Sequence, residues 1–194
     1  MPYINYRDKE LAFKIVYYGP GLSGKTTNLT YVHGSLDATN KGAIVTLDTE
    51  QERTLFFDFF PLDLGAVGEY SVRLNMYTVP GQVYYEATRR LILEGADGVV
   101  FVADSQPSRL EDNIESFSML QKSLQSFGIQ WQRFPIVLQY NKRDLPDLLP
   151  VGTIEDTFGL DGIPTFEAVA TEGKGVIETI RVASRMVIEK FQLC

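Results

Sequence analysis

A glycine-rich stretch ending in lysine and threonine is the strongest chemical feature of this sequence. Residues 19–26 read Gly-Pro-Gly-Leu-Ser-Gly-Lys-Thr after an apolar run that ends at Tyr18, which fits the phosphate-loop pattern G-x-x-x-x-G-K-[S/T] in a strand–loop–helix context. Glycines let backbone amides close around phosphate oxygens, and the positive end of the following helix points at them. Lys25 would neutralise the β- and γ-phosphate charges, and Thr26 would bind Mg²⁺ through its hydroxyl. The sequence therefore predicts a site for a nucleoside triphosphate with Mg²⁺.

A second motif, Asn141-Lys142-Arg143-Asp144, follows the apolar run Ile136–Tyr140. Alone, these four residues could equally be a solvated turn. At the end of a strand in a chain with a phosphate loop, however, Asp144 can accept hydrogen bonds from both the N1–H and the exocyclic amine of guanine, whereas adenine presents other donors. The motif therefore favours a guanine nucleotide and argues against a P-loop ATPase or small-molecule kinase.

The elements that must position these motifs alternate between short apolar runs and longer segments with helical spacing. Strands are predicted at Phe13–Tyr18, Ala43–Leu47, Tyr70–Tyr77, Gly98–Ala103, Ile136–Tyr140 and Thr165–Val169. Helices are predicted at Lys25–His33, Tyr84–Leu93, Leu110–Phe127, Thr153–Phe158 and Val176–Phe191. This alternation predicts an α/β fold in a single domain over residues 1–194. We expect a mostly parallel six-stranded sheet flanked by helices, with ligands at the carboxyl ends of the strands.

Composition excludes several classes of protein. The 194 residues suit one domain, and 18 Lys plus Arg against 25 Asp plus Glu give a formal net charge of −7, which disfavours nucleic acid as a partner. Cys194 is the single cysteine, so no intrachain disulfide can form and a reducing compartment fits best. No stretch approaches the roughly 20 apolar residues of a membrane span. We expect a cytoplasmic protein without a transmembrane segment.

The two motifs together resemble those of the small Ras-like GTPases. In that family the asparagine ties its motif to the phosphate loop and the lysine stem packs on the guanine ring, which the resemblance carries over to Asn141 and Lys142. The family's last motif, Ser-Ala-Lys, corresponds to Val169-Ala170-Thr171, where Ala170 would give its amide to guanine O6 and Thr171 cannot stack as a lysine stem does. The resemblance implies these phosphate-side contacts: Gly19, Gly21, Leu22, Ser23, Gly24, Lys25, Thr26 and Thr27.

The segment Thr78-Val79-Pro80-Gly81-Gln82 resembles the Asp-x-x-Gly-Gln motif of the same family. The resemblance implies that Gly81 gives its backbone N–H to the γ-phosphate and that Gln82 orients the attacking water. Thr78 stands where the family has the aspartate that holds Mg²⁺ through water. Three aspartates could supply the missing carboxylate, and the sequence does not choose between them: Asp48, Asp58 and Asp63.

Over nearly the whole chain, the resemblance is strongest to the MglA family of bacterial Ras-like GTPases of gliding motility and cell polarity, in which threonine is the usual residue at position 78. In that family a switch-I arginine acts in cis, and MglB, a small roadblock-fold protein, is the GTPase-activating partner that moves arginine and glutamine into place. The resemblance implies Arg53 and Gln82 as catalytic residues and Thr54 as a Mg²⁺ ligand. From position alone, Arg53 could equally pair with a neighbouring glutamate on a solvated loop. The resemblance rests on residues 17–29, 52–59, 77–82, 141–146 and 170–175.

This resemblance predicts a switch that binds and hydrolyses GTP and controls cell polarity and gliding or pilus-driven motility. Its expected partners are an MglB-like roadblock-fold activator and polarity and motility effectors, with recruitment to the cell pole. The missing aspartate at Thr78 leaves an alternative, a polarity adaptor that binds GTP but hydrolyses it poorly. Turnover of GTP separates the two.

Aromatic residues lie on both sides of Asp58. Phe57 and Phe59 alternate with Phe56, Asp58 and Phe60, so both faces of this segment would be apolar, and a strand of this kind specifies its register weakly. Such a strand could slide, and the resemblance to the MglA family implies a shift of register between the GDP and GTP states. The alternative is a strand buried on both faces, or a plain part of the core.

Overall fold

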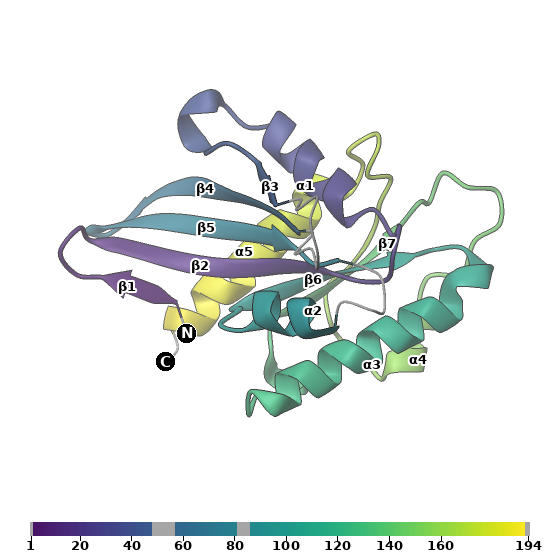
Figure 1. Ribbon diagram of the computed structural model, residues 1–194. Helices are drawn as coiled ribbons and strands as arrows, with labels where there is room; N and C mark the ends of the chain where they lie inside the picture. Colours follow the sequence, from purple (N-terminus) through teal and green to yellow (C-terminus); the bar gives the residue numbers. More distant parts are fainter. Residues whose placement is uncertain (1, 48–56, 81–85, 193–194) are drawn as a thin grey trace.

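The computed structural model describes residues 2–47, 57–80 and 86–192 (Figure 1). Within these residues, eight strands form one sheet in the order β3-β4-β5-β2-β6-β7-β8, and β1 pairs with β2. The strands are β1 (Tyr3–Asn5), β2 (Glu10–Tyr18), β3 (Val45–Leu47), β4 (Phe57–Val67), β5 (Tyr70–Thr78), β6 (Gly98–Asp104), β7 (Ile136–Asn141) and β8 (Thr165–Glu167). The helices are α1 (Lys25–Gly34), α2 (Glu86–Leu93), α3 (Leu110–Ser126), α4 (Thr153–Phe158) and α5 (Val176–Gln192), with short 3₁₀ turns at Ala38–Asn40, Pro107–Arg109 and Trp131–Arg133.

The α/β class and the mostly parallel sheet are confirmed, but the prediction of six strands is wrong. β2 is parallel to β5 and β6, and β7 is parallel to β6 and β8, whereas β1, β3 and β4 join through antiparallel pairs. The six predicted strands are present, and β1 and β4 are additional. β1 is too short to form an apolar run. β4 contains Pro61, which lies beyond the part of β4 that pairs with β3 (Phe57–Phe59). On that side Pro61 only accepts the backbone N–H of Gly42, beside the isolated bridge between Lys41 and Leu62, so no ladder hydrogen bond from Pro61 is needed.

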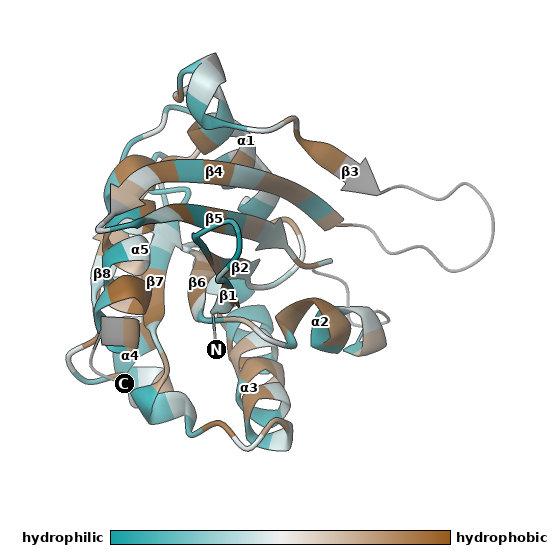
Figure 2. Ribbon diagram, turned by 90° about the vertical axis from the view of Figure 1, so that its left-hand side faces the viewer, coloured by the Kyte–Doolittle hydropathy of each residue, from teal (hydrophilic) through white to brown (hydrophobic). Residues whose placement is uncertain are grey.

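Two hydrophobic cores cover the two faces of the sheet. α1 and α5 pack on one face, and α2, α3 and α4 pack on the other (Figure 1). The alternation of side chains in β2 supplies both cores, because Val16 and Tyr18 point to the α3 side whereas Ile15 and Tyr17 point to the α5 side. Both hydrophobic and hydrophilic residues occur along the helices, as expected for helices with one face against a sheet (Figure 2).

The carboxyl ends of the parallel strands lie at one edge of the sheet. β2, β5, β6 and β7 end at Tyr18, Thr78, Asp104 and Asn141, and the residues after each of them meet there. The phosphate loop and the Asn-Lys-x-Asp motif are therefore brought together, as the fold class predicts. Among the described helices, none has the length and apolar character needed to cross a lipid bilayer.

Candidate nucleotide-binding site

The phosphate loop connects the end of β2 to the start of α1 and lines a cavity of about 430 Å³. Lys25, only 6% exposed, lies inside the loop and donates from Nζ to the carbonyl oxygens of Gly19 (3.0 Å) and Pro20 (2.6 Å). Burial, followed by the nearby positive charges of Arg89 and Arg109, lowers the pKa of Lys25 to about 7. A phosphate bound beside Lys25 would favour its charged form and raise that pKa again.

Asn141 joins three segments of the site. Its Nδ2 donates to the carbonyl oxygen of Ser23 (2.7 Å), and its Oδ1 accepts the backbone N–H of Ala170 (3.0 Å). Gly24 permits this close approach, because a Cβ there would lie 2.2 Å from Asn141 Nδ2 and its φ is +100°. The tie between the asparagine and the phosphate loop is therefore present. The amide of Ala170, predicted for guanine O6, has Asn141 as its partner in this structure.

A second cavity of about 230 Å³ adjoins the first. The two share Leu22, Gly24 and Thr27, so they form one groove that runs from the phosphate loop to the Asn-Lys-x-Asp motif. The second cavity is lined by the residues predicted for the base, which are Asn141, Lys142, Asp144, Ala170 and Thr171. Leu145 and three residues of the phosphate side, Leu22, Gly24 and Thr27, complete the lining.

Lys142 is held by a buried carboxylate that the sequence analysis missed. Its Nζ lies 2.6 Å from Oδ2 of Asp104, which is 1% exposed, and the other oxygen of Asp104 accepts the backbone N–H of Gln106 (3.1 Å). This ion pair fixes the lysine stem along the base cavity. Asp104 could have been found from the sequence, because it is the single charged residue in the apolar run 98–104 and stands at the carboxyl end of that strand.

Asp58 supplies a carboxylate at the position where Thr78 lacks one. Its Oδ2 accepts hydrogen bonds from Thr26 Oγ1 (2.7 Å) and Thr78 Oγ1 (3.0 Å), and its backbone N–H donates to Thr78 Oγ1 (2.8 Å). Asp58 is 8% exposed and lines the phosphate cavity. The threonine hydroxyl predicted to bind Mg²⁺ is therefore in direct contact with a buried carboxylate.

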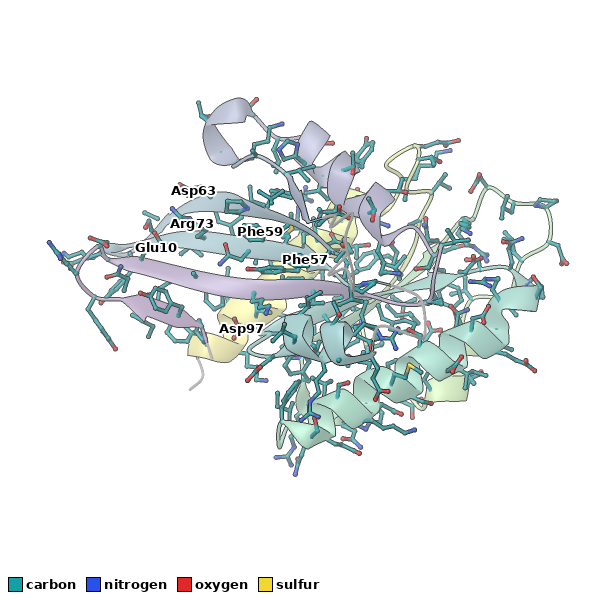
Figure 3. All side chains as sticks on the ribbon, viewed as in Figure 1. Glu10, Phe57, Phe59, Asp63, Arg73 and Asp97 are labelled. Carbon is teal, nitrogen blue, oxygen red and sulfur yellow. The ribbon has the colours of Figure 1, made fainter. Side chains whose placement is uncertain are left out.

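Asp63 lies farther along β4, away from this cavity. It accepts the backbone N–H of Gly65 (2.8 Å) and pairs in register with Arg73, whose guanidinium contacts Glu10 (3.1 Å), at the end of the sheet distant from Phe57 (Figure 3). The third candidate, Asp48, lies outside the described residues. Of the two described aspartates, Asp58 is the one at the site.

Several predicted residues fall outside the part of the chain that the structure describes. Arg53 and Thr54 belong to residues 48–56, and Gly81 and Gln82 belong to residues 81–85. The described residues that adjoin both gaps line the phosphate cavity: Phe57 and Asp58 follow the first, and Thr78, Val79 and Pro80 precede the second.

Arg109 also reaches the phosphate loop, and it belongs to no sequence motif by which it could have been identified. It lies at the end of the 3₁₀ turn after β6, and its Nη2 donates to the carbonyl oxygen of Gly21 (2.7 Å). Its Nη1 forms an ion pair with Asp112, and its Nε lies 3.7 Å from Asp104 Oδ2.

A phosphate loop after one central strand, held by an asparagine at the end of another, defines the class of this fold as the Ras-like G domain of the small GTPases. No family model matches the chain. Its sequence is 48% identical, over 192 residues, to the mutual gliding-motility protein MglA of Myxococcus xanthus (strain DK1622). The alignment covers 99% of this chain and 98% of that protein, so the chain belongs to the MglA family.

Proposed function

We propose that this chain is a GTP-binding and GTP-hydrolysing switch, formed by a single G domain over residues 1–194. The observation that carries the proposal is the continuous groove between the phosphate loop and the Asn-Lys-x-Asp motif, which Asn141 holds together through Ser23. The phosphates bind the loop amides and Lys25. Asp144 accepts the guanine donors, while Lys142, Ala170 and Thr171 border the base.

The residues around Thr26 fit a Mg²⁺ ion. Thr26 offers a hydroxyl and Asp58 a carboxylate within 2.7 Å of each other, and hard oxygen donors are those that Mg²⁺ prefers. Held by these oxygens, Mg²⁺ would offset the negative charge of the phosphates. Thr26 and Thr54 are direct ligands in our proposal. Asp58 has the role of the aspartate that the Ras-like GTPases carry at the position of Thr78. Thr78 orients Asp58 through two hydrogen bonds.

Hydrolysis would use three residues outside the described part of the chain. Arg53, presented by the same chain, stabilises charge on the γ-phosphate oxygens, a contribution of about 10³ to 10⁵ in rate where an arginine finger is supplied. Gln82 orients the attacking water, and Gly81 gives its N–H to the γ-phosphate. An MglB-like roadblock-fold protein acts as activator by bringing Arg53 and Gln82 into place. Membership of the MglA family supports this assignment.

The alternative is a polarity adaptor that binds GTP without useful hydrolysis. Thr78 is the observation that favours it, because the usual carboxylate is absent from β5. The contact between Asp58 and Thr26 favours the GTPase instead, since a carboxylate is present at that place from the neighbouring strand.

The name of the Myxococcus relative supports a role in motility. We infer that this chain acts in the cytoplasm, is recruited to the cell pole, and controls cell polarity and gliding or pilus-driven motility through effectors. It binds no nucleic acid, consistent with its net charge of −7.

Single-turnover hydrolysis of GTP tests the switch. We expect the wild type to hydrolyse GTP faster with a roadblock-fold partner, and Arg53→Ala to lose that acceleration while still binding GTP. If the wild type binds GTP but never hydrolyses it, the adaptor takes the place of the switch. If ATP displaces bound GDP as effectively as GTP does, the proposed recognition of guanine by Asp144 is wrong.

A separate experiment tests Asp58. The measurement is the rate of GDP release as a function of free Mg²⁺, which does not require hydrolysis. We expect Asp58→Asn to raise the Mg²⁺ concentration needed for slow release by about tenfold or more, because the negative charge next to the cation and its charge-assisted hydrogen bonds are lost. Adding Thr78→Asp should restore the wild-type concentration. Asp63→Asn, on the same strand but distant from the cavity, is the matched control and should change nothing. Equal behaviour of the two asparagine variants would refute the assignment.

A further inference from the structure

The phosphate loop carries a leucine in a backbone conformation that side chains disfavour. Leu22 has φ of +63°, in the left-handed region, and its side chain is 87% exposed, so packing of the side chain does not compensate for the backbone. Leu22 also lines both cavities of the nucleotide groove. Something other than side-chain burial must hold this part of the loop.

Arg109 contacts the loop at this peptide. Its Nη2 donates to the carbonyl oxygen of Gly21 at 2.7 Å, and that carbonyl belongs to the peptide group between Gly21 and Leu22. In a trans peptide, the C=O and the N–H point in opposite directions. A carbonyl held by Arg109 therefore turns the N–H of Leu22 away from Arg109. Among the described residues, no acceptor takes this N–H.

Arg109 is itself held in place on two further sides. Nη1 pairs with Asp112 one turn into α3, and Nε faces the buried carboxylate of Asp104, which also binds Lys142. A guanidinium is suited to this geometry because its donors lie in a rigid plane and reach several acceptors at once. The arginine thus links the phosphate loop to α3 and to the carboxylate behind the base cavity.

We propose that Arg109 is a positioning residue that fixes the Gly21–Leu22 peptide, so that the Leu22 N–H is directed into the groove as a donor to a phosphate oxygen. The inference rests on the proposed nucleotide binding. Arg109 acts through the backbone of Leu22 and does not itself contact the nucleotide.

The test is a double-mutant cycle on the rate of GDP release, measured with a fluorescent guanine nucleotide. Arg109→Ala should speed release by about tenfold, the usual effect of losing a hydrogen bond from a charged donor. Glycine adopts a positive φ without strain, so the loop of Leu22→Gly needs less support. In that background, we expect the effect of Arg109→Ala to fall to about twofold, a coupling typical of residues that act together.

Three controls separate positioning from other roles. Arg109→Lys keeps the charge but has one ammonium for several acceptors, so we expect an intermediate rate. Asp112→Ala removes one of the two carboxylates that hold Arg109 but leaves the Gly21 contact, so we expect a rate between those of the wild type and Arg109→Ala. Arg133→Ala removes an exposed arginine at the opposite end of the sheet and should change nothing.

The outcomes distinguish this inference from the proposed function. If wild type retains GDP but Arg109→Ala releases it at the wild-type rate, the inference fails and the proposed function stands. If Arg109→Ala has the same effect with leucine and with glycine at position 22, and Arg109→Lys restores the wild-type rate, the arginine contributes only its charge and the inference is overturned. If wild type does not bind guanine nucleotides, both are wrong.

Discussion

Replacing Asn141 by alanine should both destabilise the fold and loosen the nucleotide groove. Asn141 is 3% exposed, and its amide makes hydrogen bonds to Ser23 O (2.7 Å) and from Ala170 N (3.0 Å). Alanine removes the donor and the acceptor together. Because both partners are backbone groups at a buried position, neither can turn away to find another partner.

The magnitude follows from these two hydrogen bonds. Each buried backbone group left without a partner costs about 1 to 3 kcal/mol. The sum is about 2 to 6 kcal/mol, and water entering the space left by the side chain would offset part of it. We therefore expect the free energy of unfolding to fall by about 2 to 4 kcal/mol, which in a chain of this size lowers the Tm by about 5 to 15 °C.

The assay is urea unfolding followed by circular dichroism, together with GDP affinity. Asn141→Asp is the informative second variant. It keeps an acceptor for Ala170 N–H but places a carboxylate oxygen where Nδ2 now donates to Ser23 O, so a buried negative charge would face a carbonyl oxygen. Despite its nearly identical shape, we expect it to be at least as destabilising as alanine.

Gln139→Leu is the matched control, two residues earlier on the same strand. Gln139 is fully buried, its Nε2 donates to Thr179 Oγ1 (3.0 Å), and its Oε1 has no hydrogen-bond partner among the described residues. Thr179 keeps its own bond to Gly175 O, so leucine should change the free energy of unfolding by less than about 1 kcal/mol. If Asn141→Ala were as mild as this control, or Asn141→Asp milder than Asn141→Ala, the reasoning from unpaired backbone groups would be wrong.

Three further substitutions probe the surroundings of the site. Tyr140→Phe removes a hydroxyl that accepts two backbone N–H groups at the start of α4, and should lower the free energy of unfolding by about 2 to 4 kcal/mol in urea titrations while leaving GDP affinity nearly unchanged. Gly173→Ala should destabilise more than Gly162→Ala. Both have φ near +77°, but only at 173 would the new Cβ fall within the ring of Tyr31, and thermal melting of the two variants isolates that clash. Burial raises the pKa of Tyr17, whose hydroxyl has no partner among the described residues, so the wild type should lose stability above about pH 10, where the unfolded chain ionises first. Tyr17→Phe should be up to about 1 kcal/mol more stable at neutral pH and should lose less stability in alkaline unfolding titrations.

Much of the fold was predictable because local patterns agree with it. The runs of β2, β6 and β7 are apolar at nearly every position, as strands covered on both faces are, and α4 has the predicted bounds. Only the aromatic start of β4 was considered as a strand, and the full length of β4 was not predicted, because Pro61 and three glycine or aspartate positions interrupt its pattern. Such a strand forms because it pairs with β5, and a local sequence pattern carries no information about that pairing.

The residues of the site also differ in whether a local sequence pattern could identify them. The phosphate loop and the Asn-Lys-x-Asp motif are contiguous in sequence, so their residues could be identified directly. The choice of Asp58 over Asp63 could not, because it depends on the register that pairs Phe59 with Tyr77 and so sets Asp58 beside Thr78. The role of Arg109 could not be predicted either, because its contact with Gly21 joins residues 88 positions apart.

In the proposed function the carboxylate near the cation comes from β4 and not from β5, so the proposed cation site depends on a strand pairing. An aspartate at position 78 would lie at the end of a central strand, fixed by β2 on one side. Asp58 instead belongs to β4, where Phe60 packs into the α5 core while Phe57 packs into the α3 core, so the described part of this strand has apolar residues toward both faces. A shift of one residue between β4 and β5 would turn Asp58 to the opposite face, and a shift of two would put Phe60 beside Thr78. Any movement of β4 along β5 would therefore remove the carboxylate from Thr26. If Thr26 and Asp58 hold Mg²⁺ as proposed, cation binding would be coupled to the position of β4.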